Sequence, residues 1–240
     1  VSYEVPMVLA LLVPVLLGRT MGINSLVASQ QVWYIAMAPI AALIFFISSM
    51  AETGRAPFDL IEAESELVAG YQTEYSGLKF GMFFVGEFLH AFTISALTAT
   101  LFLGGWRGPW SETIPILGTV WFFIKTFMVY FVVAWVRISL PRLRIDQMLN
   151  FNWKVLTPLA LVLLMVTALV EKLFGLALPG LNLADTAIPW VRAAIHLAVN
   201  MLIFWGAISL LKRVRVKARR VVGSPRPVAI APEPPASVIS

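Results

Sequence analysis

The sequence predicts an all-α protein built as a polytopic bundle of transmembrane helices. Of its 240 residues, 59% are apolar and only 13% are charged, whereas about a quarter of the residues of an average soluble domain are charged. The mean hydropathy is +0.84. Apolar runs of about 20 residues, long enough to cross a hydrocarbon core as a helix, recur along the chain. We therefore expect an integral membrane protein without a nucleic-acid partner.

Six predicted spans form a transmembrane domain, residues 1–211, which a tail follows over residues 212–240. The predicted spans are residues 2–18, 32–50, 80–103, 114–137, 153–171 and 188–211. An acidic loop, residues 51–79, joins the second span to the third, and a basic loop, residues 138–152, joins the fourth to the fifth. The tail is basic and then rich in proline, so we expect it to be disordered.

The distribution of basic residues predicts the orientation of the spans. By alternation, the acidic loop, the basic loop and the tail lie on one side, and they carry thirteen Lys and Arg residues against three on the other side. Basic residues are enriched in cytoplasmic loops, so we expect this side to be cytoplasmic. The run "KRVRVKARR" is expected to contact anionic lipid headgroups. The chain begins without Met or a signal-peptide pattern, so we expect a longer natural chain.

The acidic loop concentrates carboxylates that a helix would bring together. Residues 51–75, "AETGRAPFDLIEAESELVAGYQTEY", contain six of the thirteen acids of the chain. If residues 58–70 are helical, Asp59, Glu62 and Glu66 stand at i, i+3 and i+7 and share one face. Neighbouring carboxylates raise one another's pKa, which lets a group of acids exchange protons near neutral pH. A partly helical acidic loop is therefore a candidate functional site.

Three further acids lie in the spans or at their ends. Glu87 lies inside the third span, and a charge at that depth usually faces the protein interior or a wet cavity. Gly81 and Gly86 indicate close helix packing around it. Glu4 and Glu52 lie near the cytoplasmic ends of the first and second spans, where the alternative of simple contact with the membrane interface stays open. We expect the three acids to form a line running inward from the acidic loop.

Four other polar residues of the spans have less specific patterns. Lys125 and Arg192 are candidates for an ion path, although Arg192 can also reach the membrane interface. His90 and His196 are interpreted as polar packing residues, because no further metal ligand lies near them in the sequence. The chain has no cysteine, so it cannot hold an iron–sulfur cluster through thiolates. We expect no metal site and no covalently bound cofactor.

The basic loop, within "VRISLPRLRIDQMLNFNWK", has two interpretations that the sequence leaves open. Its arginines can orient the spans and contact lipid headgroups. They can equally dock acidic surface on a peripheral subunit or pair with the acidic loop, for which the forked guanidinium group is suited. The residues that we predict to dock a neighbouring subunit are Glu74, Arg137, Arg142, Arg144 and Asp146.

Four motifs occur together and in a fixed order. They are "SYEVP" at 2–6, "AETGRAPFDLIEAESELVAGYQTEYSGLKFGMFFVGEF" at 51–88, "LFLGGW" at 101–106, and "PRLRIDQ" at 141–147 with "NWK" at 152–154. This set resembles the NuoH family, the membrane subunit (subunit 1) of proton-pumping NADH:quinone oxidoreductase, respiratory complex I. The resemblance covers about residues 1–170. It departs from the family at Gly54, where the pattern usually has Asn, and in lacking the segments that precede "SYE".

The resemblance implies a subunit that joins the membrane arm to the peripheral arm. It implies a chamber in which ubiquinone or menaquinone is reduced, and partners that carry the Fe–S clusters and FMN. Peripheral-arm subunits, small membrane subunits and antiporter-like subunits are the implied partners, in a bacterial cytoplasmic (inner) membrane. The implied chamber residues are Arg55, Asp59, Glu62, Glu64 and Glu66. The implied proton-path residues are Glu4, Glu52 and Glu87.

Two alternative functions remain. The same superfamily contains ion-translocating anchor subunits of membrane-bound hydrogenases and formate hydrogenlyases, which work without quinone. A stand-alone transporter or membrane scaffold is a more distant alternative. The fuller match to "AETxRxPFDL" and "ESELVAGY" favours the quinone enzyme.

Overall fold

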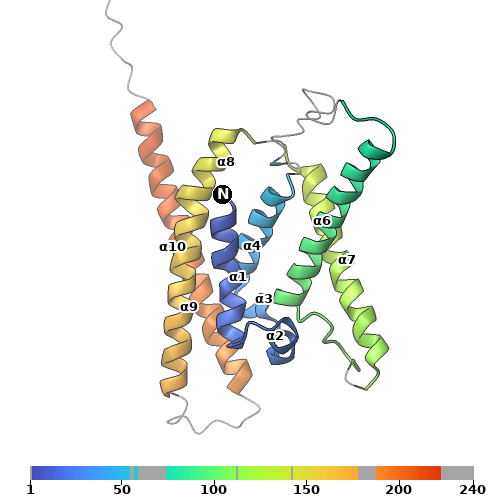
Figure 1. Ribbon diagram of the computed structural model, residues 1–240. Coiled ribbons are helices and arrows are strands. Elements are labelled where there is room, and N and C mark those ends of the chain that lie inside the picture. Colours follow the sequence, from blue (N-terminus) through green and yellow to red (C-terminus); the bar gives the residue numbers. More distant parts are fainter. Residues whose placement is uncertain are drawn as a thin grey trace, which may run out of the picture. The chain divides into compact units, whose positions relative to one another are not determined.

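The computed structural model describes residues 2–54, 57–58, 74–111, 113–141, 143–177 and 188–222. Every regular element within these residues is a helix (Figure 1), which confirms the predicted all-α class. The chain divides into two compact units, Val1–Ile203 and Phe204–Ser240. The apolar core and the candidate site lie in the first unit.

The first predicted span, residues 2–18, corresponds to α1, which forms a bent pair with the helix that follows it. Helix α1, Glu4–Gly18, is followed after a 60° bend by α2, Ile23–Ser29. Arg19 ends α1 in the left-handed conformation, with φ 51°. Fifteen helical residues span about 22 Å, which is less than a hydrocarbon core of about 30 Å. The segment therefore reaches spanning length only if α1 and α2 are taken together.

The second predicted span contains two helices where we expected one. Helix α3, Tyr34–Met37, is separated from α4, Pro39–Glu52, by Ala38, whose φ of −134° is not helical. Proline disfavours the helical conformation of the residue before it, and Pro39 itself fits the first turn of α4, where its missing N–H is not needed. The apolar run is continuous, but the helix is not.

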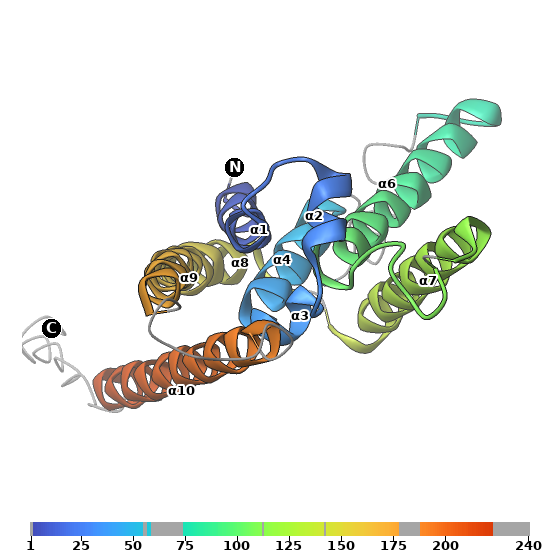
Figure 2. The same ribbon diagram turned by 90° about the horizontal axis from the view of Figure 1, so that it is seen from below.

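Helices α6 and α7 are long antiparallel neighbours. Helix α6, Leu78–Phe102, and α7, Pro115–Ser139, contain 25 residues each and pack on each other (Figure 2). Their bounds agree closely with the third and fourth predicted spans. The turn after α6 uses Gly104 and Gly105, whose φ values of 75° and 48° are positive. Glycine adopts such angles without steric cost.

The helix that contains the fifth predicted span begins at Ile145, eight residues earlier than we predicted. Three consecutive elements, α8 over Ile145–Phe151, the π-helical turn η2 over Asn152–Leu156, and α9 over Thr157–Ala177, form one continuous helix. The second half of the predicted basic loop is therefore helical. Its start is stabilised by a hydrogen bond from the backbone N–H of Arg144 to Oε1 of Gln147, 3.4 Å long, in the manner of a helix cap.

A proline accounts for the π-helical turn. The backbone N–H of Thr157 donates to the carbonyl of Asn152, five residues back. Pro158 follows directly. It has no backbone N–H to donate, and in an α-helix its ring clashes with the carbonyl four residues earlier. Widening the helix by one residue relieves that conflict.

Helix α10, Ile188–Val222, runs beyond the end of the sixth predicted span at residue 211. Residues 212–222, expected as part of a disordered tail, are helical. The sequence from Lys212 to Val222 contains no glycine or proline, so nothing in it ends the helix. Four described helices are long and apolar enough to span a membrane, or five with the bent pair, where we predicted about six.

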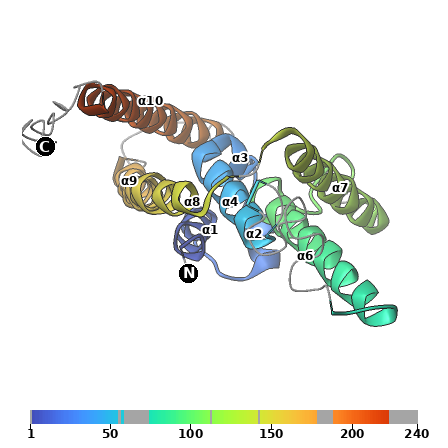
Figure 3. The same ribbon diagram turned by 90° about the horizontal axis from the view of Figure 1, so that it is seen from above.

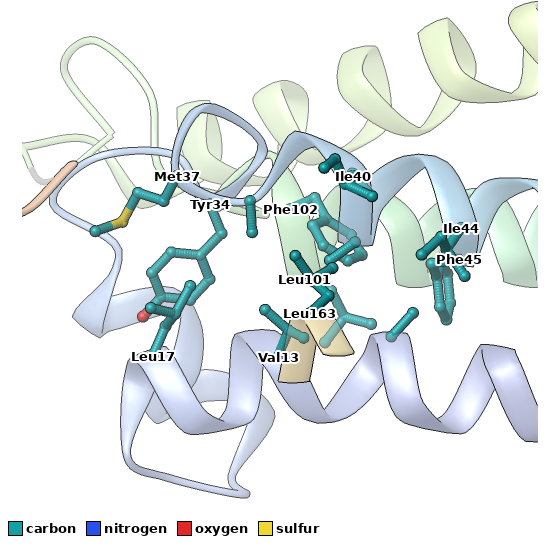
Figure 4. Close-up of a cluster of buried hydrophobic side chains, with 14 of the residues drawn as sticks. Val13, Leu17, Tyr34, Met37, Ile40, Ile44, Phe45, Leu101, Phe102 and Leu163 are labelled. Atoms are coloured by element: carbon teal, nitrogen blue, oxygen red, sulfur yellow. The ribbon is translucent and has the colours of Figure 1, made fainter. Parts of the chain in front are cut away.

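Two apolar clusters form the core of the first unit. The inner cluster, which includes Val13, Ile44, Phe102 and Leu163, joins α1, α4, α6 and α9 (Figure 4). The rings of Phe45 and Phe102 lie 5.7 Å apart within it. The other cluster consists of Met50, Ala51, Phe58, Val133 and Met148. We call it the acidic-end cluster, because Ala51 adjoins Glu52 and Phe58 precedes Asp59 in the sequence. These clusters hold α4 between α1 and α6 (Figure 3).

Candidate functional site

The three predicted proton-path acids belong to neighbouring helices. Glu4 is the first residue of α1, Glu52 is the last residue of α4, and Glu87 lies in the first half of α6. Helix α4 packs on both α1 and α6. Figure 1 shows that α1 begins, α4 ends and α6 begins at the same end of the bundle. We call this the acidic end. Glu4 is exposed, whereas Glu52 and Glu87 are half-buried.

The acidic-end cluster lies beside two of these acids. Tyr3, next to Glu4, packs against the cluster, and Ala51, next to Glu52, is one of its members. Phe58, which immediately precedes Asp59 of the acidic loop in the sequence, is another. The residues adjacent to Glu4, Glu52 and the acidic loop therefore meet in one apolar contact.

A pocket of about 340 Å³ opens beside the same cluster. Its lining is almost wholly apolar and comes from α4, the start of the acidic loop, α7 and the segment around α8. Met50, Phe58 and Val136 belong both to the lining and to the cluster or its packed neighbours. An apolar pocket of this kind suits the apolar part of a ligand.

The acidic loop and the basic loop contact each other directly. The backbone N–H of Leu143 donates a hydrogen bond of 2.9 Å to the carbonyl of Pro57. In the sequence, Leu143 lies between Arg142 and Arg144, and Pro57 lies two residues before Asp59. This contact fits the interpretation in which basic-loop arginines lie near the acidic loop.

Gly54 adopts a conformation that explains the departure from the family pattern. Its φ is +64°, in the left-handed region, and a side chain there would meet no atom within 4 Å. Glycine and asparagine are the two residues that enter this region most readily. The backbone at the end of α4 is thus compatible with either residue.

Several predicted site residues cannot be placed. Those that lie outside the described residues are Arg55, Asp59, Glu62, Glu64, Glu66 and Arg142. Among the docking candidates, Glu74, Arg144 and Asp146 are exposed, and Arg137 in the last turn of α7 is half-buried.

The described residues do not make the close packing that we expected at the glycines near Glu87. A methyl group added at Gly81 or Gly86 would meet no atom within 4 Å, and most residues from Gly81 to His90 are exposed. We took these glycines as a sign that another helix packs closely against α6. No described helix does so at these two positions. His90, expected as a packing residue, is itself exposed.

A second polar cluster, which we did not predict, lies at the opposite end of the first unit. Glu171 of α9 is only 6% exposed and accepts hydrogen bonds from Arg192 of α10, with Nε–Oε2 and Nη2–Oε1 distances of 3.1 and 2.7 Å. Nε2 of His196 lies 3.2 Å from Oε2, and Nη2 of the exposed Arg19 lies 3.3 Å from Oε1. The carboxylate is thus surrounded by basic side chains.

The same cluster attaches α10 to the rest of the first unit. Nη2 of Arg192 also donates to the carbonyl of Leu17 in α1, at 2.7 Å. Nδ2 of Asn200 donates to the carbonyl of Met37 in α3, at 3.1 Å. Arg192, His196 and Asn200 stand at i, i+4 and i+8, so their shared helix face was readable in the sequence. Their partner Glu171 was not.

Lys125, the other candidate for an ion path, is held by backbone groups. Its Nζ donates to the carbonyls of Leu103 and Arg107, at 2.7 and 2.6 Å, and lies 5.1 Å from the centre of the Trp33 ring. The two carbonyls belong to the turn that follows α6, so the ammonium group fixes that turn to α7. No group of three or more metal-binding side chains occurs among the residues that the structure describes.

Comparison with known proteins identifies the family of the chain. Residues 1–168 match the family model described as NADH dehydrogenase. The chain is 49% identical over 176 residues to the H subunit of NADH-quinone oxidoreductase from Anoxybacillus flavithermus, a match that covers 72% of this chain and 52% of that protein. The equivalent protein of Protochlamydia amoebophila is 50% identical over 169 residues, covering 70% and 50% of the two chains.

A third relative extends the similarity beyond the matched family region. The H subunit of NADH-quinone oxidoreductase from Dehalococcoides mccartyi is 40% identical over 213 residues, or 89% of this chain and 55% of that protein. The chain thus spans about half the length of the curated relatives it matches. Together with its apolar helices, these matches indicate a multi-pass membrane protein. The chain belongs to the family described as NADH dehydrogenase.

Proposed function

We propose that this chain is part of the membrane subunit of an NADH:quinone oxidoreductase, in which it helps to form the quinone chamber and couples quinone reduction to proton translocation. The family and the printed names of its relatives support the enzyme class. With no cysteine and two histidines, the chain offers few ligands for a redox centre. The resemblance to the NuoH family implies that electrons reach the quinone from partner subunits that carry FMN and Fe–S clusters.

The observation that carries the proposal is the convergence at the acidic end. Glu4, Glu52 and the start of the acidic loop adjoin one apolar cluster, and an apolar pocket of about 340 Å³ lies against it. A quinone has an apolar ring and tail with two carbonyl oxygens, so it needs an apolar surface and proton donors together. Chamber roles are proposed for Arg55, Asp59, Glu62, Glu64 and Glu66.

The proposed mechanism follows from charge balance. Reduction of a quinone to a quinol takes up two electrons and two protons. Negative charge that develops on the quinone draws protons from nearby acids, and those acids regain protons from their neighbours. Glu52, Glu4 and Glu87, on three adjoining helices, supply a route along which such a change in protonation moves away from the chamber.

The orientation and the partners are part of the same proposal. The basic loop and the basic run from Lys212 face the cytoplasm of a bacterial inner membrane, since their side carries thirteen Lys and Arg residues against three on the other side. The acidic end then faces the peripheral arm, which docks on Glu74, Arg137, Arg142, Arg144 and Asp146. Small membrane subunits and antiporter-like subunits adjoin the remaining helices.

Replacement of Glu87 tests the proposal. In the full-length subunit within the whole complex, Glu87→Gln is expected to lower quinone-dependent proton translocation by about tenfold or more, because a positioned proton-transfer group contributes roughly 10²- to 10⁴-fold. The assembled complex is expected to persist. His90→Gln, one turn away on the exposed part of α6, is the matched control. Normal coupled turnover of the Glu87 variant would remove this residue from the route.

A further inference from the structure

Two buried polar atoms near the acidic end have no hydrogen-bond partner among the residues that the structure describes. They are Oγ of Ser48 in α4 and Oδ1 of Asn152 in η2. Both side chains are essentially inaccessible, with exposed fractions of 0% and 1%. A buried polar atom without a partner costs about 1–3 kcal/mol, so such atoms in a stable fold are commonly satisfied by ordered water.

Ser48 differs from the other buried serine and threonine residues that the structure describes. The hydroxyls of Ser49, Ser95 and Thr167, for example, donate to a backbone carbonyl three or four residues earlier. The remaining buried hydroxyls of this kind, those of Thr98, Ser111 and Thr126, do the same. Ser48 lies one turn before Glu52 on the same face of α4. Within the described residues, no other hydrogen bond competes for its hydroxyl.

Asn152 is presented by the π-helical turn. Its Nδ2 lies 3.4 Å from Oγ of Ser2, two residues before Glu4, while its Oδ1 is unpaired. Single π-helical turns inside α-helices are frequent at functional sites, because they re-aim a side chain. Here the turn directs a buried carboxamide towards the start of α1.

Both residues lie at the boundary between the two apolar clusters. Along α4, Ser48 lies between Ile44 of the inner cluster and Ala51 of the acidic-end cluster. Along the α8–α9 helix, Asn152 lies between Met148 of the acidic-end cluster and Leu156 of the inner cluster. Helix α4 and the turn η2 thus each place one polar residue between the inner cluster and the acidic-end cluster.

We propose that Ser48 and Asn152 are positioning residues that hold ordered water between Glu4 and Glu52. This inference rests on the proposed function of those two acids. Oδ1 of Asn152 accepts a hydrogen bond from the water, and the Ser48 hydroxyl can donate or accept, so the pair orients the water. A protonated Glu4 gives its proton to the water while the water gives another to ionised Glu52. The water is regenerated, and one proton has moved from Glu4 to Glu52.

The test compares variants in the full-length subunit within the whole complex. Ser48→Ala and Asn152→Leu remove the polar atoms and nearly conserve volume. Ser49→Ala is the control, because Ser49 is equally buried in the same helix but its hydroxyl bonds to the carbonyl of Phe46. The readouts are protons translocated per quinone reduced, the amount of assembled complex, and ordered water in a high-resolution map. Glu52→Gln is measured in parallel.

We expect Ser48→Ala and Asn152→Leu to lower the proton-to-quinone ratio severalfold, with Ser49→Ala unchanged and assembly normal. Water density is expected within hydrogen-bond distance of Asn152 Oδ1. A purely structural role would instead lower assembly and leave the ratio unchanged, which would overturn the inference. If Glu52→Gln lowers the ratio but Ser48→Ala and Asn152→Leu do not, this inference fails and the proposed function stands. An unaffected ratio in Glu52→Gln would contradict both this inference and the proposed proton route through Glu52.

Discussion

The guanidinium group of Arg192 on α10 holds the carboxylate of Glu171 on α9 through two hydrogen bonds, of 3.1 and 2.7 Å. The Glu171 side chain is only 8% exposed. The pair thus joins the last helix to α9 through a largely buried polar contact.

Breaking this pair is expected to destabilise the protein. Arg192→Gln leaves the Glu171 carboxylate buried with less positive charge around it, and the loss of one partner of a buried pair costs about 3–5 kcal/mol. Thermal unfolding of the purified complex measures the effect. Arg19→Gln is the control, because Arg19 contacts the same carboxylate but its side chain is 70% exposed, so its loss should cost about 1 kcal/mol or less. Equal effects of the two variants would contradict the assignment.

Lys125 is expected to matter for stability rather than for proton movement. Lys125→Met leaves the carbonyls of Leu103 and Arg107 without their shared donor, which costs about 1–3 kcal/mol for each buried group left unpaired. Unfolding temperature should fall, and the proton-to-quinone ratio of the remaining complex should not. Lys172→Met, at an exposed position of α9, serves as the control. A lower ratio at unchanged stability would restore Lys125 as an ion-path residue.

The left-handed conformation of Gly54 predicts an order of substitutions. Gly54→Asn is expected to be nearly neutral, because asparagine tolerates a positive φ. Gly54→Val should cost about 1–2 kcal/mol or more and disturb the start of the acidic loop. Quinone reductase activity and unfolding temperature measure both effects. Gly81→Ala in the exposed part of α6, with ordinary helical geometry, should instead be neutral or slightly stabilising. A neutral Gly54→Val would show that the left-handed turn is dispensable.

The acids of the acidic loop are expected to act on quinone reduction specifically. Asp59→Asn or Glu62→Gln should lower NADH oxidation by quinone more than NADH oxidation by ferricyanide, because ferricyanide accepts electrons before they reach the chamber. The ratio of the two activities is the measurement. Parallel losses in both assays would indicate an assembly defect instead.

The sequence predicts those parts of the fold that depend on apolar length alone. Helices α6 and α7 lie close to their predicted bounds, since long uninterrupted runs admit few other structures in a membrane. The break at Ala38 was encoded by Pro39, but the continuous apolar run hid it. Helix α8 was missed because its sequence is short and polar, like that of a loop. The hydrogen bond from Arg144 to Gln147 that caps it is visible only in the structure.

The candidate site divides in the same way. Glu4 begins one predicted span and Glu52 ends the next. Because successive spans run in opposite directions, the sequence alone places both acids at the same end of the bundle. Glu171 could not be paired from the sequence, since Arg192 and His196 reach it only through tertiary packing. The interpretation of Gly81 and Gly86 failed for a related reason: a small residue permits a close approach, but it does not supply the neighbour.

The hydrogen bond between Leu143 and Pro57 has a mechanical consequence. Leu143 stands two residues before a helix that continues without interruption from Ile145 to Leu176, a length of about 48 Å. One end of this rod is tied to the first residues of the acidic loop, and its other end carries Glu171. The α8–α9 helix therefore joins the start of the acidic loop to the Glu171–Arg192 pair at the opposite end of the first unit.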